Sequence, residues 1–232
     1  MSLPTLPSPV PGHFVLDALY LGAHPAIIRH LLHSGPPDHT GLRRSIAEAF
    51  TGHRVEHLES RVRQIADELL DHIELKSDVD LVAEFAAPLS IAVVCELLDV
   101  PLDDHDEFRR CAEALLAGED AEAVRSSGDV VVRHLVGLVA DRRAHPGDDF
   151  FSALVHADDQ LDDLVSSALL LLVACHETTV DLITDGVRAL LPADKLDEHP
   201  LFDRGVHDDV AAPLAGVAAR IAIGSLLERR TR

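Results

Sequence analysis

The apolar run LLLLVACHETTVDLI, residues 169–183, forms the centre of a helix predicted over residues 161–191. Its most apolar part, from Ala168 to Cys175, is too short to cross a bilayer, which takes about 20 apolar residues. The run therefore predicts a helix in the core of a soluble protein. Glu177 places a carboxyl group in these apolar surroundings. Burial there raises the pKa of a carboxyl group and suits it to act as a general acid.

Further helices are predicted on both sides of this run. Their ranges are 13–33, 38–50, 54–75, 80–99, 104–117, 121–143, 148–156 and 211–229, with a loop over 192–210. The apolar residues of 54–75 fall on one face, which is typical of an amphipathic helix. No segment shows a useful strand alternation, so the predicted fold class is all-α. Residues 1–12 are rich in proline and predict an irregular arm, and residues 13–232 predict a single helical domain.

The composition excludes several classes of function. The chain has 232 residues, 47% of them hydrophobic, which is enough for one domain with its own core. Its net charge of −20 argues against nucleic-acid binding, because phosphate contacts need basic clusters. The N-terminus lacks a signal-peptide pattern, and three cysteines at unrelated positions suggest a reducing compartment. We therefore expect a cytoplasmic protein with no membrane and no nucleic-acid partner.

The segment FDRGVHDDVAAPLA, residues 202–215, carries the first of several family motifs. It resembles the haem-binding loop of the bacterial cytochromes P-450, roughly F-G-x-G-x-H-x-C-x-G-A-P-L-A. The matching residues are Phe202, Gly205, His207, Ala212, Pro213, Leu214 and Ala215. Asp209 stands where the family has the cysteine that ligates haem iron. A thiolate pushes electron density onto the iron and favours O–O cleavage, and a hard carboxylate ligand cannot replace it.

Two further segments, both earlier in the chain, resemble the same family, and the three motifs occur in the order that the family has. In residues 35–51, GPPDHTGLRRSIAEAFT, His39 and Arg43 match the residues of an H-x-x-x-R motif that contact the haem propionates. In the central run, Glu177 and Thr178 match the acid–alcohol pair that delivers protons to bound oxygen. The resemblance therefore implies the helical part of the P-450 fold.

The departures from the family pattern are equally informative. After Ile183 the family has an E-x-x-R helix, strands and a meander, whereas this chain reaches Phe202 within a few residues. Most of the N-terminal strands are also missing, so the resemblance implies a truncated bundle with the sheets largely deleted. Cys175 replaces the glycine that lets the central helix open around oxygen. We therefore expect no haem and no monooxygenase activity.

Two classes of function remain open at this point. In the first, which the retained Glu177–Thr178 pair favours, the chain is an enzyme that binds a hydrophobic small molecule of bacterial specialised metabolism. It would catalyse a non-oxidative cyclisation or isomerisation. In the second, it is a non-catalytic helper that activates a partner enzyme such as a glycosyltransferase, as some cysteine-less members of the family do. The pair would then be inherited without a function.

Acidic clusters offer candidate metal sites. Asp158, Asp159 and Asp162 fit the D-D-x-x-D pattern with which class I isoprenoid synthases hold Mg²⁺ and a diphosphate. This pattern would make the chain a terpene cyclase. The scarcity of aromatic residues argues against that function, because aromatic rings usually stabilise the carbocations that such enzymes form. His207 and Asp209 offer an imidazole and a carboxylate that suit zinc or iron. The structural alternative for both clusters is a solvated acidic turn or loop.

A small basic cluster is the candidate anion site. His39, Arg43 and Arg44 stand together at a predicted helix start in an otherwise acidic chain. They would clamp a carboxylate or phosphate of a bound molecule. The alternative is a helix surface held by salt bridges.

Overall fold

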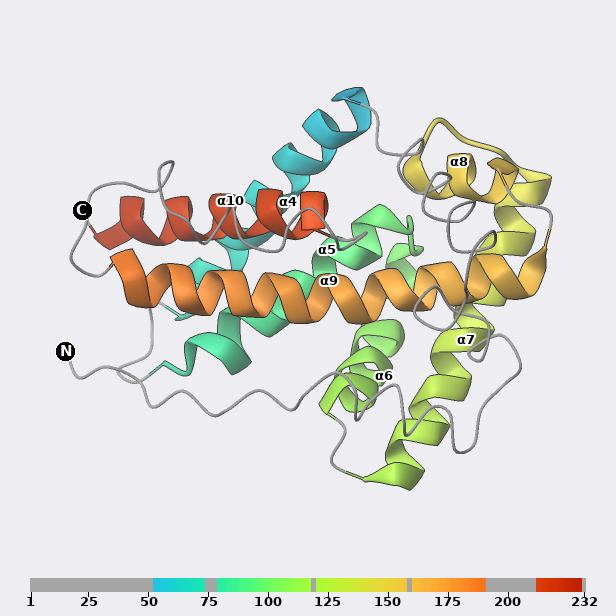
Figure 1. Ribbon diagram of the computed structural model, residues 1–232, viewed down its shortest axis with the longest axis horizontal. Coiled ribbons are helices and arrows are strands. Elements are labelled where there is room, and N and C mark those ends of the chain that lie inside the picture. Colours follow the sequence, from blue (N-terminus) through green and yellow to red (C-terminus); the bar gives the residue numbers. More distant parts are fainter. Residues whose placement is uncertain (1–51, 74–78, 118–119, 158–159, 191–211, 231–232) are drawn as a thin grey trace. The chain divides into compact units, whose positions relative to one another are not determined.

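The computed structural model describes residues 52–73, 79–117, 120–157, 160–190 and 212–230. In chain order the α-helices are α4 (Gly52–Ile73), α5 (Ala87–Leu97), α6 (His105–Ala117), α7 (Ala121–Ala144), α8 (Phe150–Ala157), α9 (Leu161–Leu190) and α10 (Ala212–Arg230) (Figure 1). A π-helical turn, η1 (Val82–Ala86), precedes α5, and a 3-10 turn, η2 (Leu102–Asp104), precedes α6. The described ranges contain no strand. The all-α prediction is therefore confirmed.

The predicted helix bounds agree with the described helices to within a few residues, with one informative difference. The helix predicted over 80–99 begins with the π turn, in which the Ala87 N–H bonds to the Val82 carbonyl. Pro88 follows directly. It has no N–H, and its ring displaces the carbonyl four residues earlier, so the turn before it widens. The predicted arm and the helices predicted over 13–33 and 38–50 lie outside the described residues.

The chain divides into two compact units. Among the described residues, the first unit contains those within 56–94 and from Ala174 onward, and the second contains 52–55 and those within 95–173. Helix α9 runs from the second unit into the first, since the boundary falls after Val173. The expectation of one domain over 13–232 stays a prediction.

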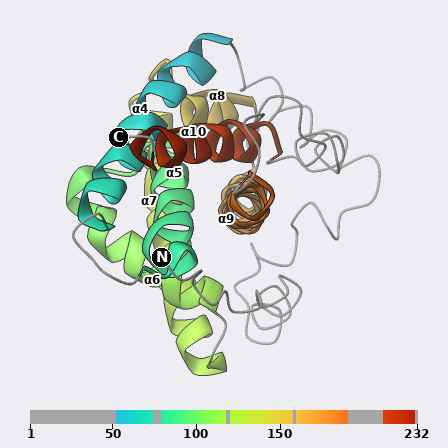
Figure 2. The ribbon, with the colours of Figure 1, turned by 90° about the vertical axis from the view of Figure 1, so that its left-hand side faces the viewer.

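In the first unit, α10 packs against both α4 and α9 (Figures 1 and 2). Arg229 donates to the Asp67 carbonyl at 3.0 Å and to the Asp71 carboxylate at 2.5 Å, which ties α10 to α4. A Cβ added at Gly186 would clash with the Ile223 Cδ1, so α9 and α10 approach closely there. A glycine at this position allows that approach.

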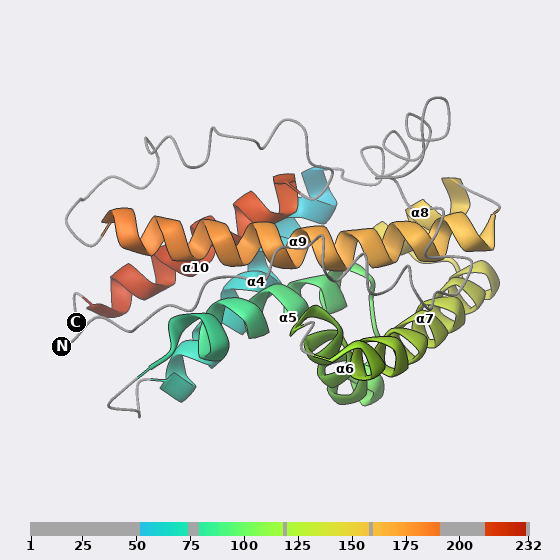
Figure 3. The same ribbon diagram turned by 60° about the horizontal axis from the view of Figure 1, so that its bottom comes forward.

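In the second unit, α6 and α7 lie side by side (Figure 3). The buried Phe108 ring of α6 meets the His134 ring of α7 edge-on, with 6.0 Å between the ring centroids. Asp120 caps the start of α7, because its carboxylate accepts a hydrogen bond of 3.0 Å from the Ala123 N–H. Arg142, at the end of α7, contacts Asp99 in the segment after α5 and Asp149 in the segment before α8.

Helix α9 is the core helix that the sequence predicts. Its segment Leu161–Ala189 is long and apolar enough to cross a membrane by length and composition, but 67% of its most apolar window is buried inside the protein. Burial of this kind is typical of a core helix of a soluble protein. The helix carries the candidate catalytic residues.

Candidate functional site on helix α9

The predicted acid–alcohol pair lies near the middle of α9. Glu177 and Thr178 are both half-buried, and neither residue is without a partner. Their neighbours Cys175 and Thr179 are fully buried, with 3.7 Å between Sγ and Oγ1. Cys175, which replaces the family's glycine, thus fills core space one helical turn before Thr179.

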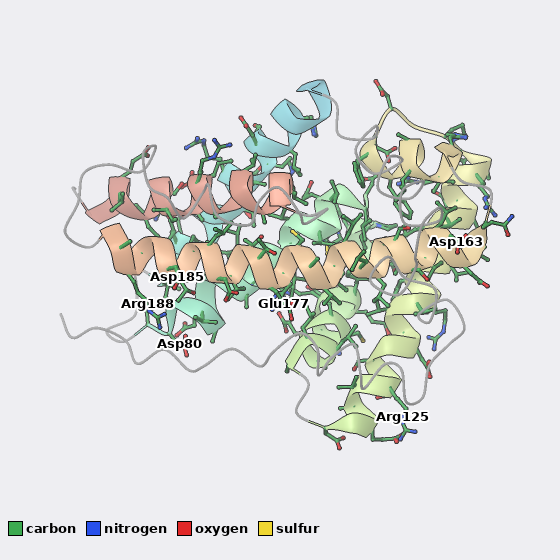
Figure 4. All side chains as sticks on the ribbon, viewed as in Figure 1. Asp80, Arg125, Asp163, Glu177, Asp185 and Arg188 are labelled. Carbon is green, nitrogen blue, oxygen red and sulfur yellow. The ribbon has the colours of Figure 1, made fainter. Side chains whose placement is uncertain are left out.

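The side of α9 that carries Glu177 is polar toward the C-terminal end of the helix (Figure 4). Asp181, Asp185 and Arg188 follow at helical spacing and are exposed. The Arg188 Nη1 lies 3.4 Å from the Asp185 Oδ1. Although Asp181 is exposed, partial desolvation of its carboxyl group, followed by the charge of Asp185, raises its pKa. The surroundings of Glu177 are therefore more polar than the apolar run alone predicted.

His176 lies between Cys175 and Glu177 and anchors α9 to α5. Its Nδ1 lies 2.7 Å from the Oγ of Ser90, a fully buried residue of α5. The Ser90 hydroxyl donates to the Ala87 carbonyl at 2.8 Å, so its oxygen can accept from the Nδ1–H of His176. Burial lowers the pKa of His176 to about 4, so the ring is neutral at pH 7. Sequence analysis missed this pair because its members stand 86 residues apart.

The candidate metal residues lie mostly outside the described residues. Only Asp162 is described, half-buried in the first turn of α9, whereas Asp158, Asp159, His207 and Asp209 are not. Within the described ranges, no group of three His, Cys, Asp or Glu side chains is arranged to hold a metal ion. Both metal sites stay predictions.

The candidate anion site also lies outside the described residues. His39, Arg43 and Arg44 all fall before Gly52, where the description begins. The anion clamp therefore stays a prediction.

Solved structures of bacterial cytochromes P450 match this fold. The ligand-free P450 monooxygenase TamI aligns with a TM-score of 0.76 and 28% identity, over 93% of this chain and 71% of that one. The mixed-function P450 MycG aligns with a TM-score of 0.72 and 30% identity, over 89% of this chain and 75% of that one. The chain belongs to the bacterial cytochrome P450 family.

Curated cytochromes P450 agree with this assignment, although no protein-family model matches the chain. Cytochrome P450 107B1 of Saccharopolyspora erythraea is 43% identical over 175 residues, which are 73% of this chain and 43% of the relative. The mycinamicin IV hydroxylase/epoxidase of Micromonospora griseorubida is 41% identical over 182 residues, 75% of this chain and 46% of the relative. This P450 chain thus spans less than half the length of these curated relatives.

The residues of this P450 do not fit a haem held by a cysteine thiolate. Such a ligand must be deprotonated, and the motif resemblance of residues 202–215 implies Asp209 at its position. The three cysteines lie elsewhere, on α5, α6 and α9. Burial raises the pKa of the Cys95 thiol to about 12, and burial also raises the pKa of Cys111. Cys175 is enclosed beside Thr179. We therefore derive no chemical step through haem.

Proposed function

We propose that this chain is a haem-free P450 relative that binds a hydrophobic small molecule of bacterial specialised metabolism and catalyses a non-oxidative step on it. The observation that carries the proposal is that no cysteine of the chain suits the role of a haem ligand. An aspartate replaces the ligand cysteine, and the thiols of Cys95 and Cys111 have raised pKa values. Without a thiolate-bound iron, oxygen activation of the family's kind has no centre. We accordingly propose a cytoplasmic protein that needs no haem.

The fold supports binding of a hydrophobic molecule. One MycG structure holds mycinamicin IV, and a curated relative is a hydroxylase/epoxidase of that compound. The described part of this chain keeps the same helical fold. We propose that it keeps the ligand class, a hydrophobic metabolite, and has lost the oxidation.

Glu177 supplies the proposed chemistry. A half-buried carboxyl group can donate a proton to a carbon–carbon double bond and take a proton back from the adjacent carbon. The bond then moves or a ring closes with no oxidant, no reductant and no net change in protons. Thr178, the next residue on α9, would hold a hydroxyl group or water beside the reacting carbon.

An absorption spectrum tests the absence of haem directly. The chain should be expressed with an added haem precursor, purified and measured beside a full-length P450 prepared in the same way. We expect no Soret band from this chain, because no thiolate stands at the ligand position. A Soret band at stoichiometric intensity would contradict the proposal, whichever side chain held the iron.

An isoprenoid diphosphate with Mg²⁺ is the most specific substrate class that we propose. Two clusters support it: a candidate metal site of Asp158, Asp159 and Asp162, and a candidate anion clamp of His39, Arg43 and Arg44. Farnesyl diphosphate with Mg²⁺ at a hundred times its Kd should stabilise the fold by about 2.7 kcal/mol in thermal unfolding. Glu177→Gln should keep this stabilisation but lose the cyclised product in mass spectrometry.

Asp129→Asn is the matched control for this experiment, because Asp129 is exposed on α7 and lies in none of the candidate clusters. It should change neither the thermal shift nor the product. The absence of any shift with Mg²⁺ and the diphosphate together would exclude this substrate class. A full yield of product from Glu177→Gln would remove Glu177 as the acid.

A non-catalytic helper is the second candidate function. The observation that favours it is that Glu177 and Thr178 both already have partners within the fold. A helper would activate a partner enzyme of the same pathway, such as a glycosyltransferase. Activation of that transferase by Glu177→Gln as strongly as by the unchanged chain would support the helper and contradict the enzyme.

A further inference from the structure

A buried serine of α5 and a histidine of α9 meet in the first unit, beside the proposed acid. The Oγ of Ser90 lies 2.7 Å from the Nδ1 of His176, and Glu177 directly follows His176 on α9. We propose that Ser90 and His176 are positioning residues, which fix the direction in which α9 presents the Glu177 carboxyl group to a substrate. This inference rests on the proton transfer proposed for Glu177.

The start of α5 holds Ser90 in place. The Asp80 carboxylate accepts hydrogen bonds from the N–H groups of Val82 and Ala83, at 2.9 Å and 3.0 Å, and so caps the π turn that precedes α5. Ser90 lies in the first turns of α5 and is fully buried. A side chain in a close-packed core has little room to move. Ser90 is therefore a fixed point to which α9 can be held.

The hydrogen bonds of Ser90 select the tautomer of the His176 ring. A serine hydroxyl has one proton, and Ser90 donates it to the Ala87 carbonyl at 2.8 Å. The Ser90 oxygen therefore accepts the second bond, which His176 donates from its Nδ1–H. Burial lowers the pKa of His176 to about 4, so at pH 7 the ring is neutral and its Nε2 carries no proton. One tautomer and one direction of the ring satisfy this network.

The direction of His176 determines the direction of Glu177. Successive side chains of an α-helix point about 100° apart, so a helix that is held at one residue is also held at the next. Cys175 and Thr179 are fully buried near this turn of α9, and close packing alone tolerates a small rotation of the helix. A hydrogen bond of 2.7 Å to a fixed partner tolerates much less, because the bond weakens steeply as its angle departs from linear.

The turnover of farnesyl diphosphate with Mg²⁺ tests the positioning role. Ser90→Ala and His176→Leu both remove the bond, and each should lower kcat about tenfold to a hundredfold, because a shift of about 1 Å can cost that much in rate. KM should change less than about twofold, since substrate binding does not depend on the direction of the acid. The double variant should lose no more than either single variant, because both act through the same bond.

Two control variants separate positioning from a loss of core packing. His176→Asn keeps an N–H donor for the Ser90 oxygen and should retain most of kcat. Ser225→Ala removes another buried serine hydroxyl, on α10, and should leave kcat unchanged.

NMR spectra test the inference without turnover. The ¹⁵N signals of the His176 ring should show a proton on Nδ1 and none on Nε2. The amide signals of Glu177 and Thr178 should shift in Ser90→Ala, but not in Ser225→Ala. These two measurements decide the inference even if farnesyl diphosphate is not a substrate.

Four results would distinguish failure of this inference from failure of the proposed function. A proton on Nε2 in place of Nδ1, or unmoved Glu177 and Thr178 amides in Ser90→Ala, would overturn the positioning role. A loss of kcat in His176→Asn as large as in His176→Leu would also overturn it, since the ring itself would then be required. The absence of product from the unchanged chain would instead count against the proposed function.

Discussion

Arg142→Met should lower the free energy of unfolding by about 3 kcal/mol, between the values for exposed and buried ion pairs. Arg142 is 12% exposed at the end of α7 and contacts the carboxylates of Asp99 and Asp141. Its Nη2 also donates to the Asp99 carbonyl at 3.2 Å, and its Nε lies 3.8 Å from the Asp149 Oδ2. Methionine keeps the apolar stem of the side chain but leaves three carboxylates without their shared cation.

The backbone at Arg142's partners explains why the effect should be large. Asp99 has a φ of 50°, a left-handed conformation that few residues other than glycine adopt, and Arg142 holds both its carbonyl and its carboxylate. Asp149 accepts the Ser152 N–H at 2.7 Å at the start of α8. Loss of the guanidinium therefore weakens the segment after α5 and the start of α8 together.

Arg125→Met is the matched control on the same helix. Arg125 is 50% exposed near the start of α7 and pairs with Glu122 at 2.6 Å (Figure 4). This exposed pair should contribute less than about 1 kcal/mol. Arg142→Lys should give an intermediate loss, because it keeps the charge but not the planar fork. Urea unfolding followed by circular dichroism measures all three variants, and equal losses at positions 142 and 125 would contradict the structural role of Arg142.

The sequence predicted those features of the fold that depend on local pattern. Helix α7 begins at an aspartate cap and ends just before His145-Pro146-Gly147, and both signals stand in the sequence beside the helix. The π turn before Pro88 has an equally local cause, but the apolar pattern of residues 80–99 continues through it and hides it. Within a continuous apolar pattern, a π turn is therefore harder to predict than the presence of a helix.

Features that depend on residues far apart in sequence could not be predicted. By contrast, the motif around Glu177 and Thr178 is local, and it predicted the position of the candidate acid on the central helix, which α9 confirms. The guanidinium of Arg142 contacts the carboxylate of Asp99, which stands 43 residues earlier in the sequence, and no sequence pattern joins the two residues. The Ser90–His176 contact likewise depends on how helices pack against one another. Periodicity predicts which face of a helix is buried, but not which side chain it meets.

The second large effect that we expect is a loss of stability of about 3 kcal/mol between pH 6.5 and pH 4, caused by His176. Burial lowers the pKa of His176 from 6.5 to about 4 in the folded chain. The unfolded chain therefore binds this proton more readily, so its uptake favours unfolding as the pH falls. The contribution is fully present above pH 6.5, decreases as the pH falls toward 4, and changes no further below that value. The shift of about 2.5 pH units corresponds to about 3 kcal/mol.

His176→Asn isolates this effect, because asparagine can still bond to the Ser90 hydroxyl and does not titrate. The difference in unfolding free energy between the unchanged chain and this variant should decrease from pH 6.5 to pH 4. Carboxylates common to both chains, such as Asp181 with its raised pKa, cancel in the difference. His72→Asn, the same substitution at an exposed position of α4, is the control for replacing a histidine elsewhere in the fold. Parallel stability profiles for the unchanged chain and His176→Asn would show that His176 does not remain neutral as the pH falls below 6.5. The Ser90–His176 contact would then have to hold α9 against α5 through a charged imidazolium ring.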